Sequence, residues 1–266
     1  MSHIPELRLG MAGSPGLLDA SGRSPIETSK YDFGTSSGPG GQNGLFAPGV
    51  PVAGLRYFSV VPLTLGAANV CALQTPTGAQ ALTLAAGTGV TAVTITPNGV
   101  NTSALDITGG NYSRGLQIVG QASVVAVTYT ITGYDEYFQL TTCVVTGPTT
   151  GTVYTKKCLR YITGIKVSGG TTAAISIGTS DVYGFPIAVN SFDQMVNLFY
   201  NQVGITATTG FVAADATSPA TSATGHVRGT YALQTASNGT DVLTAHILLS
   251  ETNAQNMNLA YGVIPA

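Results

Sequence analysis

Few residues in this chain are of types that could do chemistry. The three histidines, His3, His226 and His246, lie far apart, and no His-x-x-x-His or mixed Asp/His cluster is present. Metal centres and general bases are usually built from such clusters. His246 shares a predicted strand face with Val242 and Thr244. We therefore expect a structural histidine at 246, and neither a metal ion nor a cofactor.

The carboxylates are similarly unpromising. Asp135 and Glu136 are adjacent, and neighbouring side chains in a strand point to opposite faces of a sheet. We therefore predict a turn at a strand end, with two carboxylates that do not share a substrate. A glycan-hydrolysing pair would have to come from Asp135, Glu136, Asp181 and Asp193.

Other motifs do not favour an enzyme. The segment Gly34-Thr35-Ser36-Ser37-Gly38 matches Gly-x-Ser-x-Gly but lacks the following helix that exposes a nucleophilic serine. No phosphate-binding Gly-x-x-x-x-Gly-Lys loop is present. We expect no enzymatic activity.

The cysteines predict neither a disulfide framework nor a zinc site. Cys71, Cys143 and Cys158 are odd in number and form no Cys-x-x-Cys pair. We interpret them as buried thiols of a protein assembled in a reducing cytosol. As an alternative, Cys143 and Cys158 could face each other across a hairpin that turns at 147–151.

Composition limits the classes of partner. Only 8% of the 266 residues are charged, against roughly 25% in typical soluble domains. A surface with so few charges indicates burial against neighbours in an assembly; the alternative is a β protein solvated by hydroxyl groups. The ten basic residues are scattered, which argues against nucleic-acid binding. No apolar run approaches the ~18 residues of a membrane span, and the N-terminus has no apolar signal region.

Residues 1–55 predict an extended arm. Gly and Pro recur there too often for helical or strand periodicity. We hypothesise that this arm lies across a neighbouring subunit; the alternative is an arm folded back on its own domain. The proposed partner-binding anchors are Leu17, Leu18, Tyr31, Phe33, Leu45 and Phe46.

Residues 56–266 predict one β domain organised around residues 122–189. Period-two alternation over 123–132 and 159–167, with Ile175 and Ile177 as a third run, predicts one antiparallel sheet. Leu159, Tyr161, Ile165 and Val167 are expected to point inward. We expect Gly and Pro to interrupt the third run at 178–186.

Further short strands are expected on both sides of this region. Candidate strands are 57–61, 81–84, 93–96, 105–107 and 116–119, with a turn at Pro97-Asn98-Gly99. Residues 191–200 fit a helix capped by Ser191, or a strand, which we favour. Residues 227–233 and 242–249 predict a terminal hairpin. The fold class is all-β, an antiparallel β-sandwich or jelly roll with an extended N-terminal arm.

A series of turn-and-strand motifs resembles those of tailed-bacteriophage virion structural proteins of the capsid cement or decoration type. The motifs are Thr132-Gly133-Tyr134-Asp135, Tyr161-Ile162-Thr163-Gly164-Ile165, the 177–186 segment, Phe211-Val212-Ala213-Ala214-Asp215, Ser218-Pro219-Ala220-Thr221 and Arg228-Gly229-Thr230-Tyr231. The resemblance implies a non-enzymatic subunit on the capsid surface, made in the host cytoplasm. Its implied partners are the major capsid protein and copies of itself, as a dimer or trimer.

Two alternatives belong to other classes. The first is another virion component, such as a head fibre, a tail-associated protein or a receptor-binding module. The second is a glycan hydrolase carried on a virion.

Overall fold

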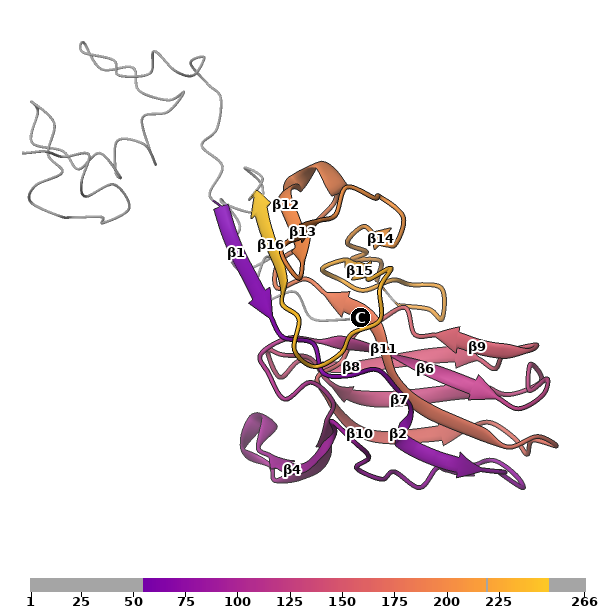
Figure 1. Ribbon diagram of the computed structural model, residues 1–266. Helices are drawn as coiled ribbons and strands as arrows, with labels where there is room; N and C mark the ends of the chain where they lie inside the picture. Colours follow the sequence, from indigo (N-terminus) through magenta and orange to yellow (C-terminus); the bar gives the residue numbers. More distant parts are fainter. Residues whose placement is uncertain (1–54, 219, 249–266) are drawn as a thin grey trace, which may run out of the picture. The chain divides into compact units, whose positions relative to one another are not determined.

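The computed structural model of this chain describes residues 55–218 and 220–248 (Figure 1). The sheets belong to the unit that runs from Tyr57 to Ile247. The predicted arm, its six apolar anchors, His3 and the Gly34–Gly38 motif lie outside the described residues.

The described part of the chain is all-β, as predicted. Its strands form three sheets, and its only helical segments are short 3-10 turns, among them η2 (Pro97–Gly99) and η3 (Phe192–Gln194).

Sheet A has the order β1 (Leu55–Val60), β16 (Leu243–Leu248), β12 (Met195–Tyr200), β13 (Val203–Gly204). Sheet B has the order β14 (Phe211–Val212), β15 (Thr230–Ala232), β11 (Ile175–Gly184), β6 (Arg114–Gly120), β9 (Gly151–Tyr154), and β2 (Gly66–Gln74) pairs with β11. Sheet C has the order β4 (Thr91–Ile95), β5 (Thr102–Asp106), β10 (Tyr161–Val167), β7 (Thr128–Tyr134), β8 (Leu140–Thr146), and β3 (Gln80–Ala81) pairs with β10.

Sheets B and C form the predicted antiparallel sandwich. Alternate side chains of both sheets enter one apolar core, because successive residues of a strand point to opposite faces. Sheet B contributes Val70, Cys71, Leu116, Ile118, Ile175 and Ile177. Sheet C contributes Leu105, Tyr129, Ile131, Cys143, Val145, Ile162, Ile165 and Val167. Each fully buried aliphatic side chain stabilises the fold by about 1.5–3 kcal/mol.

Aromatic contacts connect η3 with sheet B. The ring of Phe192 lies 5.8 Å from that of Phe211 and 6.4 Å from that of Tyr231. Phe185 approaches Phe211 at 6.2 Å.

The central runs do not form one sheet. The first two pair as predicted, β7 with β10, but the third is β11 of sheet B. The first strand begins at Thr128, and 125–126 form a turn with Val125 exposed. Strand β11 continues through Gly178, where a Cβ atom would collide with the carbonyl oxygen of Gly66. Gly178 therefore permits close packing of β2 and does not break the strand.

A bulge in β10 overturns the predicted facing of Tyr161. Ile162 pairs with Gly133, whereas Gly164 pairs with Thr132, so Thr163 is an extra residue. Such an insertion reverses the facing of the residues beyond it. Ile162 therefore enters the core, and Tyr161 lies on the outer face of sheet C.

The C-terminal hairpin was a wrong prediction, because β15 belongs to sheet B and β16 to sheet A. For residues 191–200, the helical interpretation holds only for the first turn, and the favoured strand holds for the rest. Ser191 caps η3 through the backbone N–H of Asp193, and the strand β12 follows. The turn at 97–99 is confirmed, with φ of 52° at Asn98 and 80° at Gly99.

Candidate functional site

One buried charge cluster lies at the turn between β7 and β8. The Arg228 Nη2 atom lies 2.7 Å from Asp135 Oδ2 and 3.1 Å from Glu136 Oε1. All three side chains are almost completely buried. The turn at 135–136 was predicted correctly. The expectation that the two carboxylates diverge was wrong, because a turn, unlike a strand, lets neighbours converge on one guanidinium group.

The same cluster fixes the turn in place. Asp135 Oδ1 accepts hydrogen bonds from the backbone N–H groups of Tyr137 and Gln139, at 2.9 and 2.8 Å. The Tyr137 hydroxyl donates to the carbonyl of Pro186, and the Arg228 guanidinium lies 4.8 Å above the Tyr137 ring. Arg228 Nε donates to the carbonyl of Phe185. The turn is therefore tied to the segment that follows β11.

Burial decides the protonation of the groups around this cluster. Burial raises the pKa of Glu136, and Asp135 adds to that rise, while Arg228 opposes it. Burial lowers the pKa of His226 well below its ordinary value, and the positive charges of Arg228 and Lys157 lower it further. The His226 ring is therefore neutral, and its Nδ1 accepts the backbone N–H of Cys158 at 3.4 Å.

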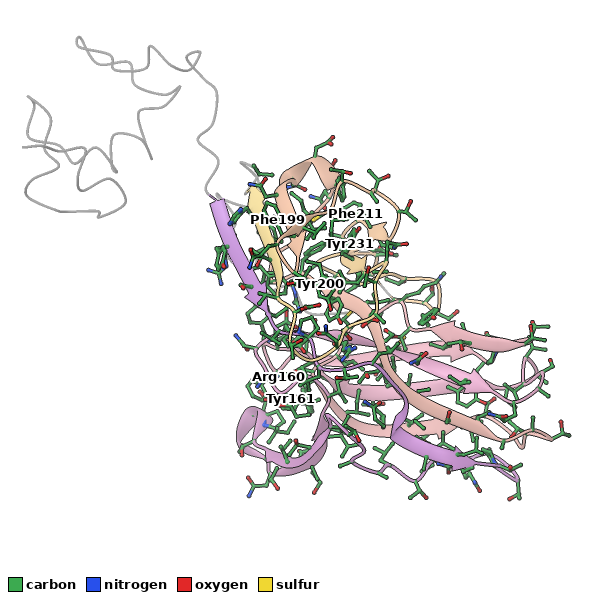
Figure 2. All side chains as sticks on the ribbon, in the orientation of Figure 1. Arg160, Tyr161, Phe199, Tyr200, Phe211 and Tyr231 are labelled. Carbon is green, nitrogen blue, oxygen red and sulfur yellow. The ribbon has the colours of Figure 1, made fainter. Side chains whose placement is uncertain are left out.

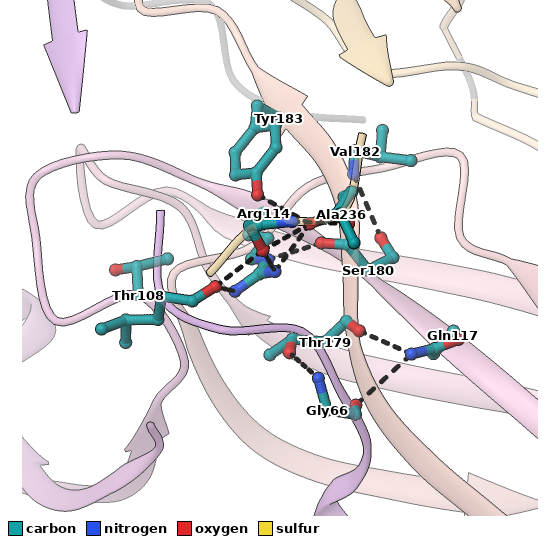
Figure 3. A network of polar contacts seen from close by, with 12 residues as sticks. Gly66, Thr108, Arg114, Gln117, Thr179, Ser180, Val182, Tyr183 and Ala236 are labelled. Atoms are coloured by element: carbon teal, nitrogen blue, oxygen red, sulfur yellow. Dashed lines mark hydrogen bonds and ion pairs between the residues drawn. The ribbon is translucent and has the colours of Figure 1, made fainter. Parts of the chain in front are cut away.

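A second buried arginine lies at the start of β6. Arg114 Nη1 donates to the carbonyl of Leu63 at 2.7 Å, and Nη2 lies 3.0 Å from Asp181 Oδ1. Ser237 and Tyr183 also bind Asp181 Oδ1, at 2.6 and 2.9 Å. Figure 3 shows these contacts beside a second set, in which Gln117 donates to the carbonyl of Thr179.

In both clusters the carboxylates are paired with a buried arginine. Asp135, Glu136 and Asp181 are each held by an arginine. Because Asp135 and Glu136 are buried, a sugar could not reach them. Asp193 lies apart from both clusters, exposed in η3. The four carboxylates considered for glycan hydrolysis are thus not brought together in an open cleft.

The remaining residues considered for chemistry have structural surroundings. His246 is half-buried on β16, 3.3 Å from the Asn197 side chain, and its ring lies 5.3 Å from that of Tyr57 at a tilt of 35°. Cys71, Cys143 and Cys158 are free and buried, as predicted. The hairpin alternative for the cysteines was wrong, because β8 and β9 lie in different sheets. Within 55–218 and 220–248 no cluster of His, Cys, Asp or Glu could hold a metal ion.

The outer face of sheet C carries an exposed apolar surface that alternation alone did not predict. We call the side chains of Tyr134, Phe138, Leu140 and Tyr161 the aromatic platform. Tyr161, Tyr134 and Leu140 lie side by side in register across β10, β7 and β8. Phe138, from the β7–β8 turn, stacks on Tyr161 with ring centroids 5.3 Å apart. Phe138 is 44% exposed and Leu140 is 54% exposed, whereas Tyr161 is 6% exposed and packs against Ile95 and Ala104.

The platform is flanked by Arg160, whose guanidinium lies 4.7 Å above the Tyr161 ring (Figure 2). Arg160 also lies 3.7 Å from Asp106 and donates to Asn111. The adjacent hollow of about 390 Å³ is lined by β4, β5 and β10 and includes Val93, Ala104 and Thr163. None of the residues that line this hollow is ionisable.

Comparison of the chain with protein-family models, with curated proteins and with solved structures gives no significant match. Among the described residues no helix is long and apolar enough to cross a membrane.

Proposed function

We propose that this chain is a structural subunit of a tailed-phage virion that binds and stabilises the capsid shell as a cement or decoration protein. It acts without catalysis, as an oligomer in contact with the major capsid protein. The observation that carries this proposal is the aromatic platform, an uncharged apolar surface that exposes Phe138 and Leu140 on a face that a solvated sandwich would cover with polar groups.

The sparse charge of the chain supports the same function. With 8% of its residues charged, the protein has little electrostatic means of recognising a partner. Contacts between such surfaces rest on apolar burial and hydrogen bonding, and they depend weakly on salt. Many equivalent sites on a shell would make individually weak contacts collectively strong.

Three of the six segments that resemble phage virion proteins meet around Arg228. Asp135 from one segment and the Phe185 carbonyl from another both contact this arginine, which belongs to a third. These three motifs therefore share a structural role, which is to enclose Arg228. Such a role is consistent with a resemblance that lies in the fold.

The test is binding of the purified full-length chain to phage shells from which the endogenous protein has been removed. We expect saturable binding that changes little between low and moderate salt. Deletion of residues 1–45 should leave a folded β domain that docks weakly. Full-strength binding by this truncation would rule out the arm as a tether, and binding to tails alone would favour the tail-associated alternative.

A further inference from the structure

The aromatic platform is held on the outer face of sheet C by three separate features. The β10 bulge turns Tyr161 outward. Phe138 has a φ of 60°, a backbone conformation that bulky residues rarely adopt. Arg228 and Asp135 fix the turn that presents Phe138. Bulges and strained backbone persist at sites where a side chain must be aimed.

Two of the four platform residues are tyrosines, a residue type that is enriched at protein-binding hot spots. Rigid aromatic groups also lose little entropy on binding. The ring of Tyr161 stacks on Phe138, and the Arg160 guanidinium lies over the same ring. The surface is therefore organised before any partner arrives.

We propose that the aromatic platform receives the N-terminal arm of a second copy of this chain, through the segment 33–54. This inference rests on the proposed function, since an arm exchanged between copies connects neighbours on a shell. The anchors in that segment are Phe33, Leu45 and Phe46.

Charge and length favour this occupant. From residue 33 to residue 54 the chain has no charged side chain, and the platform residues are uncharged as well. Tyr161 and Leu140 are separated by two strand spacings, about 10 Å. An extended segment of about three residues spans that distance. Residues 1–54 could extend by up to about 180 Å, which is enough to reach a neighbouring copy.

The first experiment measures association of the full-length chain by sedimentation velocity over a range of concentrations. We expect Leu140→Arg to weaken association at least about tenfold, the effect of losing one hot-spot side chain. Phe138→Asn should act similarly, and it is safe for the fold because asparagine tolerates positive φ. The matched control is Thr146→Arg, an exposed position on the same face of β8, which should change association less than about twofold.

The second experiment identifies the occupant. A photo-crosslinking residue at position 140 is placed in one isotopically labelled copy and mixed with unlabelled chain. Cross-links from position 140 to residues 33–54 of the unlabelled copy support the proposal. Cross-links only within one copy, only between two platforms, or none under conditions where the chain associates would overturn it.

The arm has its own paired test. Leu45→Ser combined with Phe46→Ser should weaken association as strongly as Leu140→Arg, whereas Leu17→Ser combined with Leu18→Ser should not. Equal effects of the two pairs would contradict the assignment to 33–54.

Shell binding is measured separately. A chain that binds shells while its platform captures no arm refutes this inference alone, and arm capture without shell binding refutes the proposed function alone.

Discussion

The outer face of sheet C has two halves that are built differently. One half follows simple alternation, and its outward-facing positions are mostly threonines: Thr128, Thr130, Thr132, Thr142 and Thr146. The other half is the aromatic platform, where the same two strands end in Tyr134 and Leu140. The difference lies in the β10 bulge and in the β7–β8 turn that Arg228 and Asp135 fix, both of which lie at the platform end.

This comparison shows how a sheet can carry an apolar patch on its outer face without losing its core. Beneath both halves, Ile131, Cys143 and Ile165 enter the sandwich interior in the same way. Only the platform end depends on a buried arginine and two carboxylates. Changes to that cluster should therefore affect the platform more than the threonine half.

The largest expected effect comes from Arg228→Ala. Removal of this side chain leaves Asp135 and Glu136 buried without their counter-charge, which typically costs about 3–5 kcal/mol of unfolding free energy. The matched charge on the threonine half is Lys166, an exposed residue, and Lys166→Ala should change stability by less than about 0.5 kcal/mol. Urea denaturation measures the unfolding free energy of both variants. Equal losses of stability would contradict the difference between the two halves of the sheet C face.

The bulge provides the next comparison. A Cβ atom at Gly133 would collide with the carbonyl oxygen of Tyr161, whereas one at Gly164 would meet nothing within 4 Å. We expect Gly133→Ala to lower the unfolding free energy by about 1–3 kcal/mol and Gly164→Ala to leave it nearly unchanged. Comparable values for the two variants would show that the bulge does not require the close approach at Gly133.

The pH dependence of stability should distinguish the platform end of sheet C, next to the Arg228 cluster, from the threonine half. Because the pKa of His226 is lowered in the folded state, the unfolded chain takes up a proton that the fold excludes. Stability is then fully present above about pH 6.5 and falls on acidification, by up to about 1.4 kcal/mol per pH unit. In His226→Gln this slope should shrink over the same window. An unchanged slope would assign the pH dependence to other groups.

The smallest effect is expected from Glu136→Gln. Since the pKa of Glu136 is raised, ionisation of this carboxyl at neutral pH opposes folding, and Asp135 already balances Arg228. The substitution should raise the unfolding free energy at pH 7 by on the order of 1 kcal/mol. The gain should vanish at acidic pH, where the wild-type carboxyl is protonated. A loss of stability at pH 7 would mean that the negative charge of Glu136 is required.

Local patterns predicted the class of the fold but not its connections. Period-two alternation and turn residues identified the all-β sandwich, the pairing of β7 with β10 and the turn at Asn98-Gly99. Pairing between distant segments leaves no comparable local signal, so β11, β15 and β16 were assigned to the wrong neighbours. Within the predicted strand 159–167, the adjacent residues Thr163 and Gly164 were the only local sign of a bulge.

The candidate site was less accessible to sequence reasoning. Arg228 lies more than ninety positions from Asp135, and only folding brings them together. The platform was missed because strict alternation assigned Tyr161 to the core. Phe138 gave no signal, since its exposure follows from a positive φ that the turn imposes.

The most direct test of the central claim is an electron cryomicroscopy map of the intact particle of the phage that is proposed to encode this chain. The proposed function predicts copies distributed over the icosahedral shell, in contact with the major capsid protein, with the platform of each copy covered by a neighbouring arm. Density for this chain at the tail alone, or its absence from the particle, would contradict the claim.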